Sequence, residues 1–393
     1  MSAKLHICHI FEAIGPYSGI GKVAMSDVQI ALDAGYRVTV IAKRLHESLR
    51  DRVNWVPLYV PPRLFYVQWM TARFFIKRAL ARAKRQFGPF DIIHAHQPQV
   101  ADLADVFQCH FLTRVAYERR CLEERKDLRS RFVRLQQQGV LYAEDWCYRR
   151  WNPRTRLIFC SELLQREFHR LYGAPLRHQV LVNPCPAINI AQSSERRQAK
   201  QSILGEVPAK PVIGYIGGLH ERKGYKRLIK AMKEDTALFL LMAGDSTLNL
   251  SIPEMAGRMK GVGLVKDTAR FFAACDIVVV PSFFDPCPLV VFEAASRGCP
   301  VIVTDGVGNA QNVTENGCGA LWNPDSPIGP VVARLLDRRN DMLLRSKSMA
   351  GDLSLEKYGE SLRNVYEEVL SRFAEGLVHS PPLPGGDLES HAI

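Results

Sequence analysis

Residues 281–305 read PSFFDPCPLVVFEAASRGCPVIVTD, and two short apolar runs frame this stretch. One run, IVVV (277–280), precedes it, and the other, PVIVT (300–304), closes it. Pro-Cys-Pro interrupts regular structure, and the apolar residues from Leu289 onwards predict a helix. The order strand, loop, helix, strand predicts a parallel α/β sheet. The loop then lies at the carboxyl end of a strand, where open α/β sheets bind ligands.

The same stretch carries two carboxylates, Asp285 in the loop and Glu293 two turns into the helix. Each could accept hydrogen bonds from hydroxyl groups. The start of the helix would offer unpaired backbone N–H groups and a positive dipole end to an anion. A ligand with both phosphate and sugar hydroxyls fits these groups, so the segment predicts a nucleotide-sugar site.

Strand and helix patterns alternate along the rest of the chain, which predicts two doubly wound α/β domains facing a cleft. We expect a first domain over residues 1–187 and a second over 188–352, joined by a polar connector at 186–210. The first domain is expected to carry one long charged helix over 113–153. A last helix, 353–374, is expected to pack back on the first domain, and 375–393 has the composition of a disordered tail.

Composition sets limits on the class of protein. The 393 residues are 47% apolar and 23% charged, which is typical of a globular chain long enough for two domains. No apolar run reaches the roughly 20 residues that span a bilayer, and the N-terminus lacks a signal-peptide pattern. The ten cysteines are scattered without a Cys-x-x-Cys pair, as expected for reduced thiols. We therefore expect a cytoplasmic protein.

The excess of basic over acidic residues lies entirely in the first half. Residues 1–187 hold 29 Lys and Arg against 16 Asp and Glu, while the rest of the chain holds 23 against 24. This asymmetry points to an anionic partner, although a solvated basic surface without a partner is the alternative. Segment 113–156 interleaves arginines with aromatic residues, which is typical of peripheral membrane contact or of an acidic acceptor. Stretch 62–85 is similar, but we expect it to pack on the sheet.

Two glycine-rich loops also follow predicted strands. GGLHERKG (217–224) would let a phosphate approach closely, with Arg222 and Lys223 neutralising its charge; a chance pair of basic residues is the alternative. GPYSGIG (15–21) stands at the equivalent place in the first half, and Gly19 could bring backbone amides to the ligand. It lacks the dinucleotide-binding spacing, so it could also be a simple tight turn.

The histidines of the first half lie at or near strand ends. We expect His94 and His96 to point to opposite faces of their strand, so that at most one lies on a given face. No Cys or carboxylate partner has the spacing of a metal-ligand set, and no metal site is expected. His110, at the carboxyl end of a strand, is the candidate for the cleft.

Taken together, these motifs resemble those of family 4 glycosyltransferases, which are retaining enzymes of the GT-B fold. DPCPLVVFEAASRGCPVIVTD (285–305) resembles the acidic element of that family, and VIGYIGGLHERKG (212–224) resembles its diphosphate loop. DIIHAH (91–96), RLIFCSELLQREF (156–168) and GPYSGIG resemble landmarks of its first domain. The charged segment 113–156 is similar to the acceptor side of members that glycosylate the lipopolysaccharide core.

This resemblance implies a role for each candidate residue. Glu293 would bind the ribose hydroxyls, Asp285 a hydroxyl of the transferred sugar, and Lys223, helped by Arg222, the leaving diphosphate. His110 would lie beside the sugar and the acceptor, so that Asp285, Lys223 and His110 form the catalytic set. The donor-binding set also includes Gly19, Gly217, Gly218, Pro288, Leu289 and Val290.

Several positions depart from the family pattern and bear on the identity of the sugar. Asp285 is one methylene shorter than the usual Glu, Gly218 stands where Arg is frequent, and Pro288 replaces a common Gly. Asn183-Pro184 replaces Asn-Gly, and two further asparagines stand where Gly and Glu are frequent, namely Asn309 and Asn312.

The predicted function is transfer of a hexose-type unit from a UDP- or GDP-sugar to an envelope lipid or oligosaccharide, with no cofactor beyond the donor. One alternative is a transferase with a soluble small-molecule acceptor. Another is an inactive nucleotide-sugar binder or a GT-B epimerase. Nucleic-acid binding is not expected, because no recognised motif supports it.

Overall fold

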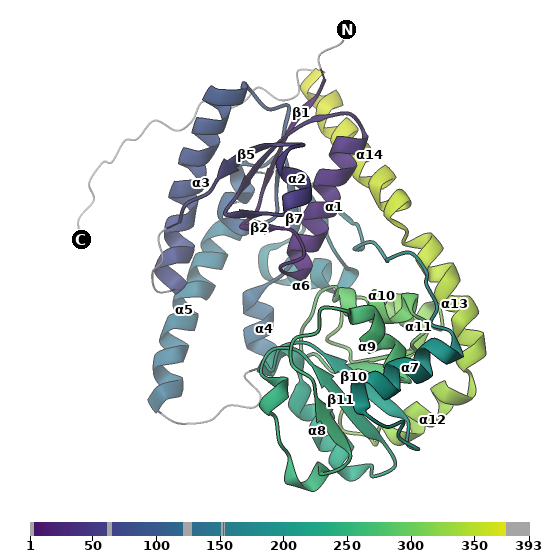
Figure 1. Cartoon of the computed structure of the whole chain (residues 1–393). Helices are drawn as coiled ribbons and strands as arrows, with labels where there is room; N and C mark the ends of the chain where they lie inside the picture. Colours follow the sequence, from purple (N-terminus) through teal and green to yellow (C-terminus); the bar gives the residue numbers. More distant parts are fainter. Residues whose placement is uncertain (1–3, 61–64, 121–127, 151, 153, 375–393) are drawn as a thin grey trace.

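The structure, a computed structural model, describes residues 4–60, 65–120, 128–150, 152 and 154–374. It has two parallel sheets, each flanked by helices, which confirms the predicted doubly wound α/β architecture (Figure 1). The expected tail, 375–393, lies outside the described residues. No helix within the described ranges is long and apolar enough to cross a membrane.

The first sheet is built from short, almost fully buried strands, as expected where helices cover both faces. Its strands, in spatial order, are β5 (Asn54–Pro57), β3 (Arg37–Ala42), β1 (His6–Ile10), β6 (Ile92–Ala95), β7 (Val106–Cys109), β8 (Arg156–Phe159) and β9 (His178–Val180). A two-residue pair, β2 (Ala13–Ile14) and β4 (Arg44–Leu45), lies beside it. The helices of this domain are α1 (Gly19–Asp33), α2 (Glu47–Arg50), α3 (Phe65–Phe87), η1 (Pro98–Leu103), α4 (Thr113–Arg120), α5 (Leu128–Tyr148) and α6 (Glu162–Tyr172).

The second sheet has the same parallel construction. Its strands, in spatial order, are β12 (Met259–Gly261), β11 (Phe239–Ala243), β10 (Val212–Ile216), β13 (Ile277–Val280), β14 (Val301–Val303) and β15 (Gly319–Leu321). The helical elements around it are α7 (Ser193–Leu204), η3 (Glu221–Lys223), α8 (Tyr225–Glu234), η4 (Thr247–Asn249), η5 (Pro253–Met255), α9 (Thr268–Ala274), α10 (Leu289–Ser296), α11 (Ala310–Glu315) and α12 (Gly329–Asp337).

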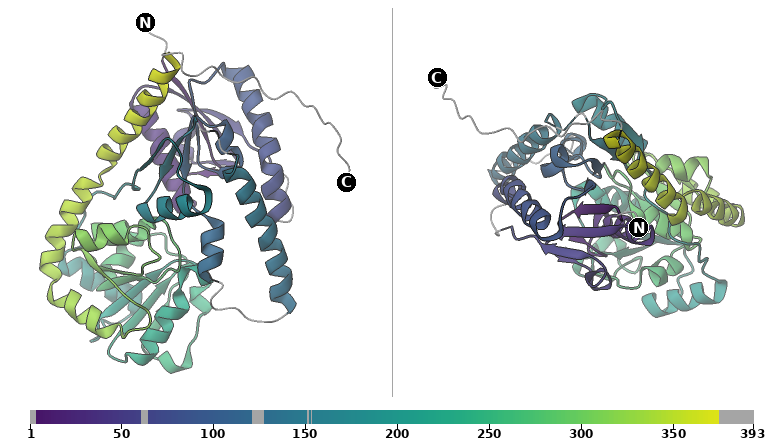
Figure 2. Two further views of the ribbon diagram at one scale, coloured as in Figure 1. Left: turned by 180° about the vertical axis from the view of Figure 1, so that it is seen from behind. Right: turned by 90° about the horizontal axis from the view of Figure 1, so that it is seen from above.

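Two helices at the end of the described chain run along one side of both domains (Figures 1 and 2). They are α13 (Arg339–Asp352) and α14 (Leu355–Ala374), and α14 packs against α1, β6 and β7 of the first domain. The Tyr358 hydroxyl donates to Asp27 Oδ1 at 2.8 Å, deep in that interface. Helices α3 and α5 flank the opposite side of the molecule.

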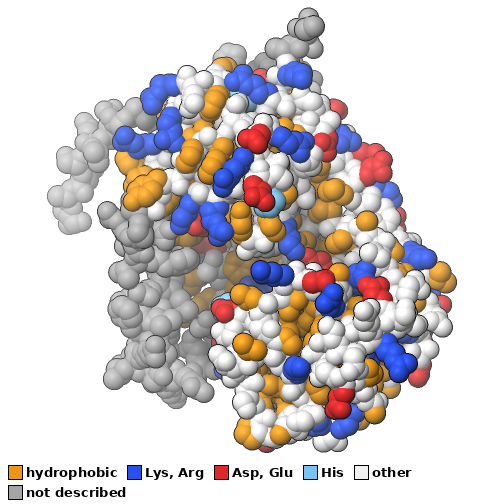
Figure 3. Space-filling model, viewed as in Figure 1, with side chains coloured by type: hydrophobic (Ala, Val, Ile, Leu, Met, Phe, Trp, Pro, Cys, Tyr) orange, Lys and Arg blue, Asp and Glu red, His pale blue; other side chains and the backbone are white. Residues whose placement is uncertain are grey.

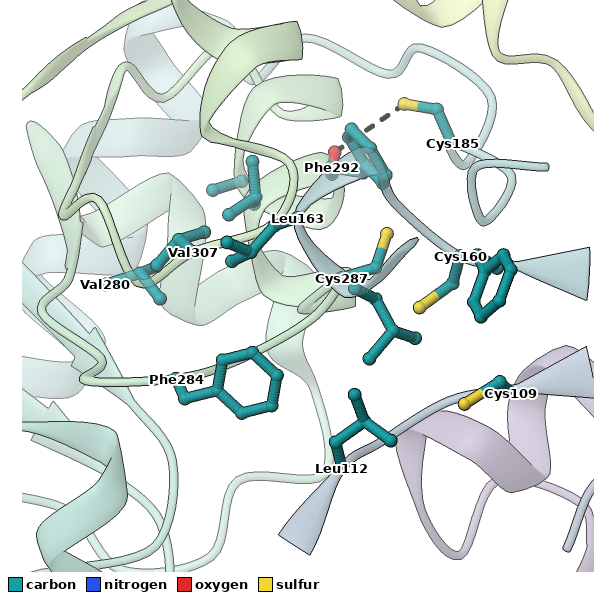
Figure 4. Close-up of a cluster of buried hydrophobic side chains, with 14 of the residues drawn as sticks. Cys109, Leu112, Cys160, Leu163, Cys185, Val280, Phe284, Cys287, Phe292 and Val307 are labelled. Atoms are coloured by element: carbon teal, nitrogen blue, oxygen red, sulfur yellow. Dashed lines mark hydrogen bonds between the residues drawn. The ribbon is translucent and has the colours of Figure 1, made fainter. Parts of the chain in front are cut away.

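Apolar side chains from the two domains meet beneath the cleft (Figure 4). Leu112 and Cys160 come from the first domain, and Phe284 and Cys287 from the second, all within one continuous core cluster. The ring of Phe111 lies 5.7 Å from that of Phe284, and Cys185 donates to Phe292 O at 3.8 Å. Nine of the ten cysteines lie in the described residues, and all nine are free and buried.

Two expectations about helices need correction. The polar connector 186–210 contains a twelve-residue helix, α7, of which only Ala199 is buried. Arg196 and Lys200 contact Asp276 Oδ1 and Oδ2 at 3.2 and 2.7 Å, and Ile203 and Leu204 pack against the core. These few apolar residues give the sequence only a weak helical period there. The expected long helix 113–153 is also two helices, α4 and α5, separated by residues 121–127, which lie outside the described part.

Candidate functional site

A cavity of about 820 Å³ lies between the two domains, at the carboxyl ends of strands from both sheets. Figure 3 shows the surface hollowed between the two domains. Every residue predicted to bind the donor or to take part in catalysis lines this cavity: Gly19, His110, Gly217, Gly218, Arg222, Lys223, Asp285, Pro288, Leu289, Val290 and Glu293. The loops that carry these residues therefore meet at one cavity.

The loop after β10 supplies the positive charge of the cavity. Lys223 donates to Asp285 Oδ2 at 2.5 Å, and Arg222 Nη1 lies 3.9 Å from Asp285 Oδ1. Arg222 also donates to Phe284 O at 3.1 Å and stacks over Phe111, with its Cζ 4.9 Å from the ring centroid. Both cations are therefore held by the neighbouring loop at the place where an anionic ligand would enter.

Glycine allows this loop to pack closely. Gly224 has φ of +66° and ends η3, and a Cβ at this position would overlap Pro281 O. A left-handed φ disfavours other residues, and the contact leaves no room for a side chain. The position of Lys223, the preceding residue, thus depends on a glycine.

The loop 281–288 is clamped from both sides. Asp285 N donates to Gly306 O at 2.8 Å, and Gly308 N donates to Asp285 O at 2.8 Å. Asn183 Nδ2 donates to Cys287 O at 3.2 Å, and Asn309 Nδ2 to Pro288 O at 3.1 Å. Asn183 and Asn309 therefore hold the carbonyl groups of this loop, and Asn309 is one of the positions that depart from the family pattern.

Helix α10 begins at Leu289, as predicted, with Pro288 as its N-cap residue and no side chain capping its first turn. The first-turn residues Leu289 and Val290 face the cavity. Glu293 lies one turn from the start of α10, and not two turns as expected, and it accepts from Lys22 Nζ at 2.6 Å. Because Lys22 belongs to α1, this ion pair links the two domains across the cavity.

His110 lies at the end of β7 and is 8% exposed. Burial lowers the pKa of His110 to about 3, so its imidazole is neutral at neutral pH. His96 Nδ1 lies 3.2 Å from His110 Nε2. His110 can therefore exchange hydrogen bonds with a ligand as a neutral group and not as a cation.

The expectation that His94 and His96 point to opposite faces is wrong. Their rings stack, with centroids 4.4 Å apart. Residues i and i+2 of a strand lie on the same face, so the His-Ala-His spacing places both rings on one face of the sheet. The His9 ring joins them from β1, 5.1 Å from His94.

The cavity also contains residues that the motifs did not indicate. Lys22 follows the 15–21 loop directly and lies in the first turn of α1. This position next to a loop that was predicted to bind the ligand is the feature of the sequence that indicates a place in the cavity. A second group follows the carboxyl ends of β11 and β12: Gly244, Asp245, Leu264, Val265 and Thr268. Gly217 was predicted because it follows a strand of this sheet, and the same reasoning applies to this group.

The chain matches two family models. Residues 17–185 match Glycosyltransferase Family 4, and residues 210–336 match Glycosyl transferases group 1. The chain belongs to the family 4 glycosyltransferases. None of the curated proteins matches the sequence at a significant level.

Solved structures of this fold cover nearly the whole chain. Sucrose-phosphate synthase from Thermosynechococcus elongatus is similar with a TM-score of 0.74 and 16% identity, covering 94% of this chain and 100% of its own. WaaG, a glycosyltransferase involved in lipopolysaccharide biosynthesis, gives 0.67 and 16%, covering 93% and 98%. Anabaena HepE in complex with UDP-glucose gives 0.67 and 16%, covering 93% and 100%. The fold of this glycosyltransferase is therefore GT-B.

Proposed function

We propose that this glycosyltransferase is retaining and metal-independent, and that it moves a hexose-type unit from a UDP- or GDP-sugar to an envelope lipid or oligosaccharide. The observation that carries the proposal is the interdomain cavity lined by Lys223, Asp285 and Glu293 from one domain and His110 from the other. In this proposal, residues 188–352 bind the donor and residues 1–187 the acceptor. The structure of HepE with UDP-glucose and the lipopolysaccharide role of WaaG support these assignments by analogy.

In this proposal, different residues along the cavity bind the ribose, the sugar and the diphosphate of the donor. Glu293 would accept hydrogen bonds from the ribose hydroxyls, and Asp285 from a hydroxyl of the sugar. Arg222 and Lys223 would bind the diphosphate, together with the amides of the Gly217 loop and of the α10 start. These two cations supply positive charge that a divalent metal supplies in other transferases.

The proposed chemistry needs no protein nucleophile. The acceptor hydroxyl would attack on the face from which the diphosphate leaves, with the leaving phosphate oxygen taking the proton. Lys223 and Arg222 would stabilise the negative charge that develops on the diphosphate, while neutral His110 would orient the hydroxyl groups. Asp285, hydrogen bonded to Lys223 at 2.5 Å, is suited to accepting hydrogen bonds from the sugar.

A panel of nucleotide sugars tests the donor assignment. We expect the UDP- or the GDP-sugars, and not both, to raise the melting temperature, because a donor at 100 times its Kd stabilises the folded state by about 2.7 kcal/mol. The best donor should be hydrolysed slowly without acceptor, and NMR should show that the first-formed sugar keeps its anomeric configuration. If no UDP-, GDP- or ADP-sugar shifts the melting temperature or is hydrolysed, the proposal is wrong.

The acceptor side is basic, which favours an anionic acceptor. Lys43, Arg44, Arg50 and Arg52 are exposed near α2, and Arg44 stacks over Tyr17 of the cavity wall with its Cζ 4.0 Å from the ring centroid. Figure 3 shows lysine and arginine side chains gathered over the first domain. Anionic lipid head groups or acidic oligosaccharides would be attracted to this face.

We also propose peripheral contact with the inner face of the cytoplasmic membrane through residues 113–156. Part of this segment serves the fold, because Arg114 pairs with Asp145, and Arg119 with Glu167. Arg149 and Arg150 are exposed, with Arg150 stacked on Trp146. Arg156 pairs with Glu368. Six further basic residues of the segment have side chains outside the described part, namely Arg120, Arg125, Lys126, Arg129, Arg131 and Arg134.

Vesicle sedimentation of the full chain tests this contact. We expect binding to vesicles with anionic lipid at low salt, and its loss at high salt, because each basic residue near the surface contributes about 1 kcal/mol. The double variant Arg149→Glu, Arg150→Glu should bind more than tenfold more weakly. Reversing two exposed lysines of the second domain, Lys226→Glu and Lys230→Glu, is the matched control. No retention of the wild type at low salt would favour a soluble acceptor.

A further inference from the structure

A group of buried polar side chains lies in the core of the first domain, outside the donor cavity. His9 on β1 pairs in register with His94 on β6, and His96 lies on the same face of β6. Helix α1 covers them with Asp27. Three of these side chains are fully buried and His96 is 3% exposed. The proposed transferase chemistry uses none of them.

The three histidines bring ring nitrogens close together, and several of these nitrogens have no partner among the described residues. His94 Nδ1 is hydrogen bonded to the Tyr366 hydroxyl at 2.8 Å, and His96 Nδ1 lies 3.2 Å from His110 Nε2. The Nε2 atoms of His94 and His96 and both ring nitrogens of His9 are buried without a hydrogen-bond partner in the structure. One nitrogen from each histidine lies within 4.8 Å of the other two.

Asp27 adds a carboxylate to this group. Its Oδ2 also has no hydrogen-bond partner in the structure and lies 3.8 Å from His96 Nε2, while Oδ1 accepts from Tyr358. Leaving so many polar atoms unsatisfied is costly, and a cation among neutral imidazoles would remove that cost.

We propose that His9, His94 and His96 bind one structural Zn²⁺ ion, with Asp27 Oδ2 as the fourth ligand. Three neutral imidazoles and one carboxylate form a ligand set that suits zinc. Tetrahedral bonds of about 2.0–2.1 Å place ligand atoms roughly 3.3 Å apart, so each histidine nitrogen would move by about 1 Å. The Asp27 side chain would turn towards them from its present position, 3.8 Å from His96 Nε2. Tyr366 and His110 would hold the second ring nitrogen of His94 and His96, as is usual around zinc.

Such an ion would join β1, β6 and α1, and through Tyr358 and Tyr366 it would also fix α14. The site is closed, with no ligand exposed by more than 3%, so its role is in stability and not in catalysis. The competing arrangement is a group of polar side chains bonded to water and to one another, with Gln108 beside His94.

Metal content of untagged full-length protein tests the proposal. Wild-type protein is unfolded with a chelator, refolded with or without Zn²⁺ or Co²⁺, and passed through gel filtration. We expect about one ion per chain, a higher melting temperature with metal, and the visible absorption of four-coordinate cobalt. X-ray absorption at the zinc edge should show nitrogen and oxygen ligands at about 2.0–2.1 Å.

Two variants and a matched control assign the site. His9→Gln should lose the ion, and Tyr366→Phe, which retains all four ligands, should weaken metal affinity about 10- to 100-fold. His6→Gln is the control, because His6 is also buried on β1 but uses both ring nitrogens in hydrogen bonds to Pro89 O and Thr39 Oγ1. Wild-type protein that refolds equally well without metal and retains no ion would overturn the proposal, as would equal retention by His9→Gln and His6→Gln proteins.

Discussion

The Lys223→Ala variant is expected to fold and to bind the donor nucleotide within a few-fold of wild type, while its turnover falls by about 10²–10³. Lys223 contacts Asp285 at 2.5 Å and lies at the cavity wall beside Arg222. A cation in this position stabilises the diphosphate more strongly as the bond to the sugar breaks and charge develops on the leaving oxygen. Its loss should therefore appear in kcat and not mainly in nucleotide affinity.

Asp285 contributes to the size of this effect. In the Lys223→Ala variant the 3.9 Å contact to Arg222 is the remaining ion pair of Asp285 among the described residues. Arg222 already donates to Phe284 O and stacks over Phe111, so it is poorly placed to replace the lost ammonium group. The Asp285 carboxylate would then oppose the negative charge that develops on the diphosphate as the bond to the sugar breaks, which lowers turnover more than nucleotide affinity.

Donor hydrolysis and sugar transfer under saturating donor measure this effect, and thermal unfolding checks the fold. Lys226→Ala is the matched control, because Lys226 is an exposed lysine three residues later that pairs with Glu221 outside the cavity. Its turnover should stay within about twofold of wild type. An equal loss in both variants, or unchanged turnover in Lys223→Ala, would remove Lys223 from the catalytic set.

Much of this site could be predicted because parallel sheets bring all strand ends to one edge. The start of α10 at Leu289 followed from Pro-Cys-Pro and the apolar run, and the convergence of Lys223 and Asp285 followed from the two strand ends. These inferences need only local sequence and the topology of one sheet.

Contacts between the domains were beyond such reasoning. Lys22 and Glu293 are 271 positions apart, and only the relative placement of α1 and α10 brings them together. The same holds for Asn183 and Cys287, which meet across the domain interface. The helix α7 has a narrow apolar side, formed by Ala199, Ile203 and Leu204, and ion pairs to Asp276 add to its packing, so the sequence signal for a helix is weak.

The Glu293→Gln variant is expected to bind the donor nucleotide about 10- to 100-fold more weakly. Hydrogen bonds to a charged acceptor contribute about 1.5–3 kcal/mol, and the neutral amide keeps the shape of the side chain but loses its charge. The variant also removes the ion pair between Glu293 and Lys22. The Lys22 side chain is 43% exposed, and exposed ion pairs contribute at most about 1 kcal/mol to stability. Affinity should therefore fall far more than the free energy of unfolding does.

Titration calorimetry with the free nucleotide, and with its 2′- and 3′-deoxy analogues, separates the two roles of Glu293. If Glu293 binds the ribose, wild-type protein should bind a deoxy analogue more weakly than the normal nucleotide. The Glu293→Gln variant should bind the two with nearly equal affinity, because the variant and the analogue remove the same contact. Lys22→Met breaks the interdomain pair while leaving the carboxylate in place, and it should keep the deoxy discrimination. Glu315→Gln, at an exposed carboxylate of α11, is the control. If Glu293→Gln protein distinguishes the nucleotide from its deoxy analogues as well as wild type does, the ribose binds elsewhere in the cavity. The ion pair with Lys22 would then be the sole role of Glu293.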